Sequence, residues 1–192
     1  MAQPITAVRM RERARPSLVA ALPEPTFLEG EDSDQYRRIA ERVRAAASPT
    51  DIIEEFCVRD IIDLQWDLFR YRRLSQSTIK LNLHHGLGKI LNNIEVPMLL
   101  QDTVDSWCKK EPSTIQKVDR MLAAAGLSMA DVSAATMELK LSELERINNL
   151  IASAEARRAN VIREVERRRT FVRSLRDAVA QVEEADFREV VS

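Results

Sequence analysis

Three aspartates in one stretch of the chain have a spacing that could support acid chemistry or hold a metal ion. Asp60, Asp63 and Asp67 recur every three or four residues, so they lie beside the apolar arc of a helix. Metal sites of this kind usually add a Glu-x-x-His pattern, which the sequence lacks. A carboxylate beside an apolar arc needs a cationic partner, because an unpaired buried charge is costly. The pattern therefore predicts a structural ion pair, with Arg158 as the partner.

The remaining motifs that could do chemistry are incomplete. His84 and His85 are adjacent and point about 100° apart on a helix, which makes them poor ligands for one metal ion. The stretch from Gly86 to Lys89 resembles part of a phosphate loop, but Ile90 stands where the loop requires Ser or Thr. We therefore predict no catalytic residue, no metal, no cofactor and no small-molecule substrate.

Arginines gather near the end of the chain and could bind phosphate groups. Eight lie between Arg157 and Arg176, against two glutamates. The candidate phosphate contacts are Arg163, Arg167, Arg169 and Arg173. The stretch from Asp51 to Asp67 carries six acids and one base, so it can neutralise this cluster. Pairing between the two stretches is favoured over nucleic-acid binding.

Composition narrows the class of protein. The chain has 192 residues, with 29 Lys and Arg against 30 Asp and Glu, which excludes a globally basic nucleic-acid wrapper. Hydrophobic residues make up 45%, enough to bury a core. No apolar run approaches the ~18 residues of a membrane span. Two cysteines are too few for a disulfide framework. We expect a cytoplasmic protein that does not enter a membrane.

The elements that position these residues are helices. Prolines and the absence of a sustained period predict a flexible arm over 1–31, followed by a helical domain over 32–186 and a tail over 187–192. Capping residues, prolines and apolar periodicity predict helices at about 33–47, 49–92, 97–110, 113–125 and 129–186. The expected caps are Asp32 or Ser33, Ser48 with Asp51 in the first turn, Gly126 at the end of the fourth helix, and Ser128 before the last. The fold class is all-α: an elongated antiparallel helical hairpin with two short connecting helices and a long coiled-coil-like C-terminal helix.

The last helix carries an apolar seam from Leu144 to Val182, with steps that alternate between three and four residues. Antiparallel packing on the helix from 49 to 92 would place Asp63 near Arg158 and the acidic stretch opposite residues 154–170. The charge match can close within one chain or between two chains.

The first long helix is apolar on a second side as well. This side comprises Val58, Ile62, Trp66 and Phe69. A helix that is apolar on two sides is either buried between neighbours or meets another chain. We therefore identify these four residues as a candidate partner surface.

Several short stretches together resemble a group of uncharacterised bacterial helical proteins. The resemblance covers roughly residues 30–170, and it implies a bacterial, mostly helical protein without an assigned activity. The stretches that carry it are Gly30–Asp32 with Tyr36, Pro49–Asp60, Asp63–Trp66, Arg70–Arg73, Glu145–Ile147 and Ile151–Arg158.

These observations favour a non-enzymatic helical protein that oligomerises or docks a protein partner through its C-terminal helix. The alternative is a nucleic-acid-binding accessory protein that uses the arginine-rich helix and the basic N-terminal arm.

Overall fold

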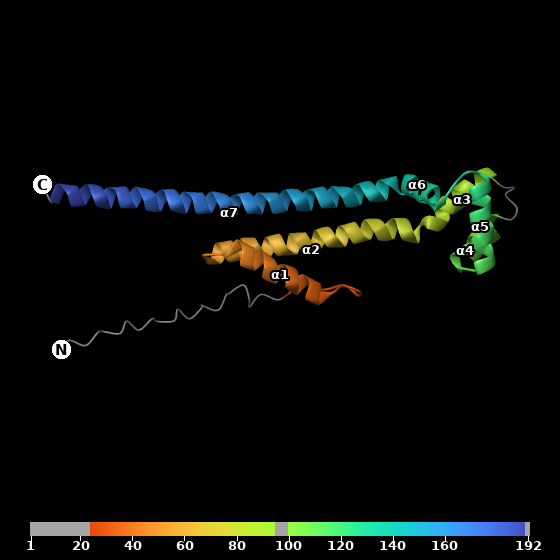
Figure 1. Cartoon of the computed structure of the whole chain (residues 1–192), viewed down its shortest axis with the longest axis horizontal. Coiled ribbons are helices and arrows are strands. Elements are labelled where there is room, and N and C mark those ends of the chain that lie inside the picture. The colour runs from red at the N-terminus through yellow and green to blue at the C-terminus, as the bar shows by residue number, and fades with distance from the viewer. Residues whose placement is uncertain (1–23, 95–99, 191–192) are drawn as a thin grey trace, which may run out of the picture. The chain divides into compact units, whose positions relative to one another are not determined.

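The computed structural model describes residues 24–94 and 100–190, and every regular element in these ranges is an α-helix (Figure 1). In chain order these are α1 (Ser33–Ala47), α2 (Ile52–Leu81), α3 (Leu83–Ile94), α4 (Leu100–Cys108), α5 (Pro112–Ala124), α6 (Met129–Leu139) and α7 (Leu141–Val190). The predicted all-α fold with a long C-terminal helix is confirmed. Within these ranges, no helix is long and apolar enough to cross a membrane.

The described residues form two compact units. Unit 1 contains the chain up to Asp63 and from Val161 onward, and unit 2 contains Leu64–Asn160. Unit 1 therefore holds α1, the beginning of α2 and the distal part of α7. Unit 2 holds the rest of α2, the four shorter helices α3 to α6, and the beginning of α7.

Local capping signals set several helix ends as predicted. The Asp32 carboxylate accepts hydrogen bonds from the first-turn amides of Asp34 and Gln35 and so caps α1. Gly126, with φ of 70°, ends α5: its amide and that of Leu127 donate back to the carbonyls of the last turn. A Ser128–Asp131 capping box then starts α6.

Two of the predicted long helices are each interrupted once. The stretch predicted at 49–92 divides at Asn82, whose side-chain amide donates to the Thr78 carbonyl at 2.7 Å and competes with regular helical bonding. The stretch predicted at 129–186 divides at Lys140, which ends α6. The helix after this break runs to Val190, so a tail starting at 187 was wrong.

Two other predicted segments include residues that the structure does not describe. Residues 1–23 of the expected arm and 97–99 of the expected helix at 97–110 lie outside it. The part of the arm that is described contacts α1. The Phe27 ring lies 5.5 Å from the Tyr36 ring, and Glu24 pairs with Arg37 at 3.0 Å.

The shorter helices of unit 2 share one hydrophobic core. The buried residues come from all four of them: Leu87, Leu91, Val104, Val118, Leu122 and Val132. A second cluster joins Leu64 and Leu68 of α2 to Ala154 of α7. Beside it, Arg72 pairs with Glu155 at 3.0 Å. The segments of α2 and α7 in this unit therefore pack on each other through the predicted seam.

Candidate functional site

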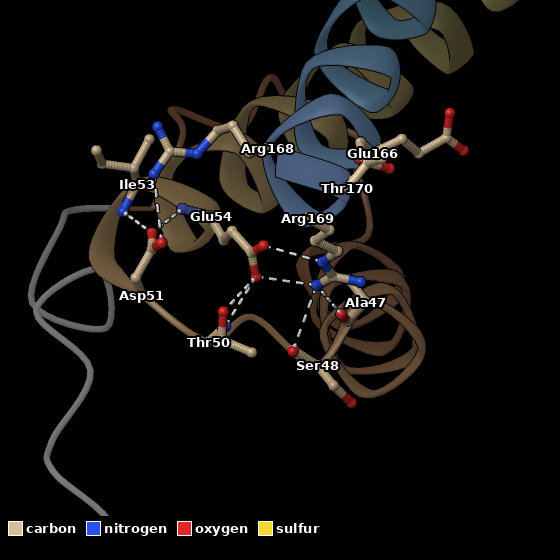
Figure 2. A network of polar contacts seen from close by, with 10 residues as sticks. All are labelled: Ala47, Ser48, Thr50, Asp51, Ile53, Glu54, Glu166, Arg168, Arg169 and Thr170. Carbon is tan, nitrogen blue, oxygen red and sulfur yellow. Dashed lines mark hydrogen bonds and ion pairs between the residues drawn. The ribbon is translucent and has the colours of Figure 1, made fainter. Parts of the chain in front are cut away.

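The arginine-rich part of α7 meets the corner between α1 and α2 in unit 1. Its centre is Glu54, whose side chain is only 3% exposed although it lies in the first turn of α2. The Arg169 guanidinium donates to both Glu54 carboxylate oxygens, each at 2.9 Å (Figure 2). The amide and hydroxyl of Thr50 donate to one of the same oxygens, at 2.8 and 3.1 Å. This two-point geometry is the strongest form of an arginine–carboxylate pair.

Arg169 also holds the end of α1. Its Nη2 donates to the Ala47 carbonyl at 2.6 Å and to the Ser48 carbonyl at 3.4 Å (Figure 2). Ser48 ends α1 in the left-handed conformation, with φ of 42°. A cation near the carbonyls at a helix C-terminus is favourable. One side chain of α7 therefore binds the end of α1 and the start of α2 together.

A second carboxylate joins the same corner. Asp51 accepts hydrogen bonds from the amides of Ile53 and Glu54, both at 2.8 Å, and so caps α2. We expected Ser48 to be this cap, with Asp51 inside the helix; instead Ser48 ends α1. The Arg168 Nη2 donates to Asp51 at 3.3 Å (Figure 2).

These contacts lower the pKa of both carboxylates, Glu54 and Asp51. The hydrogen bonds from Arg169, helped by Thr50, lower the pKa of Glu54 from 4.5 to about 2. The backbone amide of Glu54 and the Arg168 guanidinium lower the pKa of Asp51. The charge match between the acidic and basic stretches therefore closes within one chain at this corner.

The lowered pKa of Glu54 predicts an acid-sensitive contribution to stability. The unfolded chain takes up this proton near pH 4.5 and the folded chain only near pH 2, so the contribution is complete above pH 4.5 and is lost as the pH falls toward 2. We expect Glu54→Gln to remove about 2 kcal/mol of this pH dependence, measured by urea unfolding at pH 6, 4 and 3. A variant that keeps the slope of the wild type would contradict the assignment.

A groove of about 970 Å³ opens beside the corner, between α7 and the α1–α2 connection. Five arginines contribute to its lining: Arg167, Arg168, Arg169, Arg173 and Arg176. Three of these arginines already pair with carboxylates: Arg167 with Glu164 at 2.8 Å, Arg168 with Asp51 at 3.3 Å, and Arg169 with Glu54 at 2.9 Å. Arg173 and Arg176 are exposed and add positive charge to the wall, which Asp177 also lines.

An exposed apolar surface adjoins this groove on α7. We call it the α7 apolar face: Phe171, Val172, Leu175, Val179 and Val182. Their exposed fractions range from 42% to 63%. Earlier positions of the same seam are buried, among them Val165 in unit 1 and Leu144, Ile147 and Ala154 in unit 2. The seam is therefore covered in its first part and uncovered in its last part.

The predicted ion pair between the aspartates and Arg158 is not what the structure shows. Asp63 accepts from the Tyr36 hydroxyl at 2.5 Å and from Arg59 at 2.9 Å. Asp67 pairs with Arg70 at 3.3 Å, and Asp60 is exposed. Arg158 instead donates to the Gln65 side chain. Arginines one turn away on the same helix supply the partners that we expected from α7.

The predicted partner surface on α2 is also wrong. Val58, Ile62 and Trp66 are 1%, 0% and 2% exposed, so they belong to the interior. Phe69 is half-buried and packs edge-on against Trp66, with the ring centres 6.3 Å apart. Of the two alternatives for a helix that is apolar on two sides, burial between neighbours applies.

The predicted phosphate contacts have different surroundings. Arg169 is committed to Glu54 and Arg167 to Glu164, whereas Arg163 and Arg173 are exposed. The Glu54–Arg169 pair was not predicted from the sequence. The expected antiparallel register placed the acidic stretch opposite residues that include Arg169, so the signal was present. The predicted ion pair included only the aspartates of the acidic stretch, so Glu54 was left out.

No cluster of His, Cys, Asp and Glu in the described part of the chain could hold a metal ion. His84 and His85 lie with their rings 3.9 Å apart. The sequence matches no protein-family model, and no curated protein and no solved structure matches it.

Proposed function

We propose that this chain is a non-enzymatic helical interaction protein, which docks an α-helical protein partner through the α7 apolar face. The observation that carries the proposal is the exposure of five large apolar side chains in succession on one side of α7. Contiguous exposed apolar patches mark interaction sites more often than scattered apolar residues do.

The spacing of the face supports a helical partner. Val172, Leu175, Val179 and Val182 alternate in steps of three and four, which is the spacing of a two-stranded coiled-coil seam. A partner helix can insert its side chains between them, as amphipathic helices do in other grooves. The Glu54–Arg169 pair supports the proposal as well, because it holds α7 against the α1–α2 corner just before the face begins.

Nucleic-acid binding is the second candidate, and the observation in its favour is the arginine-lined groove. Most of these arginines already have carboxylate partners within unit 1. Phosphate groups would have to compete with those pairs, so this candidate has weaker support than protein docking.

A photo-crosslinking amino acid placed at Leu175 tests the proposal. In cells, we expect ultraviolet light to join this position covalently to a protein, because the side chain lies in the middle of the α7 apolar face. The matched control is Glu184, which is also exposed and points about 170° away from the centre of the face. Equal labelling at both positions, or none at Leu175, would refute docking through this face.

A further inference from the structure

The α7 apolar face lies between two groups of opposite charge on the same helix. Before and within the face are Arg169, Arg173 and Arg176, which form a row along one edge, and one acid, Asp177, follows them. At its far end are Glu183 and Glu184, both exposed. The segment is therefore positive at one end and negative at the other, and its apolar side chains lie between.

In a second copy of the chain, the charges follow the same order along α7. Whether they match those of the first copy therefore depends on whether the two helices run parallel or antiparallel. In a parallel pair, Arg173 would lie beside Arg173 and Glu183 beside Glu183. In an antiparallel pair, each basic end meets an acidic end. Charges that flank an apolar seam set partner choice and orientation in coiled coils. Charge complementarity therefore favours the antiparallel arrangement.

The apolar layers select one register for this arrangement. When Val172 faces Val182 of the second copy, Leu175 faces its Val179, and the same two layers repeat by symmetry. All four layers are then apolar. At this register Glu183 of the second copy falls at the level between Arg169 and Arg173, on the edge that carries the arginine row. The acidic end thus reaches the arginine-lined groove.

We propose that the partner of the α7 apolar face is a second copy of this chain, bound antiparallel, with Val172 opposite Val182 and with Glu183 against the arginine groove. This inference rests on the proposed docking function and names its occupant. Each face covers the other, and Arg173, which lines the groove together with Asp177, gains a second carboxylate neighbour.

Charge reversal tests the groove contact. We expect Arg173→Glu with Arg176→Glu in one chain, or Glu183→Lys in another, to weaken self-association at least about tenfold in sedimentation at low salt. Mixing the two variants should restore association, because each contact then joins opposite charges again. Loss without recovery on mixing would contradict the contact, as would no loss at all.

Cysteine cross-linking tests the direction and the register in the full chain. The native thiols Cys57 and Cys108 are free, so they are first replaced by alanine. We then expect a mixture of Val172→Cys and Val182→Cys chains to form a disulfide-linked dimer on mild oxidation. Each variant alone should stay largely unlinked, because equivalent positions would lie about 15 Å apart, which is too far for a disulfide. Glu184→Cys, on the opposite side of α7, is the matched control.

Three results would overturn the antiparallel dimer. Efficient linking of Val172→Cys alone would indicate a parallel pair. Linking at Glu184→Cys equal to that of the mixture would indicate random collision. A monomer at 100 µM together with a Leu175 crosslink to a different protein would refute the second copy and leave the docking function standing. If the Leu175 crosslink is absent as well, the docking function itself fails. Circular dichroism of each variant confirms that α7 remains helical.

Discussion

Gly86→Ala is expected to destabilise unit 2 by about 3 kcal/mol or more in urea unfolding. A methyl group at this position would lie 2.5 Å from the Val132 carbonyl oxygen and 2.8 Å from the Thr136 amide nitrogen, and nearer still to the Thr136 hydroxyl. Two of these three atoms belong to backbone, so a change of rotamer does not relieve the clash. The helices α3 and α6 would have to move apart, which disturbs the core around Leu87 and Val132.

The matched control is Gly88→Ala, two residues further along α3. Nothing lies within 4 Å of a methyl group there. Alanine favours a helix over glycine by about 0.8–1 kcal/mol, so this variant should gain stability. Opposite signs at the two positions would show that Gly86 serves close helix packing. A loss below about 1 kcal/mol for Gly86→Ala would mean that α3 and α6 do not approach this closely.

Arg169→Ala is expected to cost about 3 kcal/mol of unfolding free energy. Removing the guanidinium leaves the buried Glu54 carboxylate with only the bonds from Thr50, and a charge that loses its partner inside a protein is costly. The same change frees the Ala47 carbonyl at the end of α1. Thermal and urea unfolding measure the loss. Arg169→Lys should recover only part of it, because an ammonium group does not reproduce the two-point contact.

Arg167→Ala is the matched control for this prediction. Arg167 lies two residues away on α7 and pairs with Glu164, but its side chain is 73% exposed. Exposed pairs contribute only about 0–1 kcal/mol, so the variant should unfold almost like the wild type. If Arg167→Ala and Arg169→Ala cost the same, the burial of Glu54 would not be what makes its pair strong.

Features encoded by neighbouring residues could be predicted from the sequence. The caps at Asp32 and Ser128 and the glycine end of α5 were all expected, because a capping side chain or a left-handed residue acts within one helical turn. The seam on α7 was visible for the same reason: a helix repeats every 3.6 residues, so spacing alone identifies the residues that share a side.

The interruptions were harder to predict. Asn82 ends α2 through a bond to its own preceding turn, yet asparagine is tolerated inside many helices. Gly86 could have been a weak point of a helix or part of a loop. Its actual importance depends on Thr136, fifty residues away, whose distance from Gly86 is invisible in local sequence.

The remaining differences between the predictions and the structure come from contacts between residues that are far apart in the sequence. Periodicity along α2 correctly marked two apolar sides and a row of aspartates, but it carries no information about which neighbour covers each side. Packing buried Val58 and Ile62, and it paired Asp63 with Tyr36 and Arg59 in place of Arg158. A helix pattern shows which residues share a face, because that follows from backbone geometry. Only the approach of other helices selects which face is buried, which charges meet, and which apolar residues of α7 remain exposed for a partner.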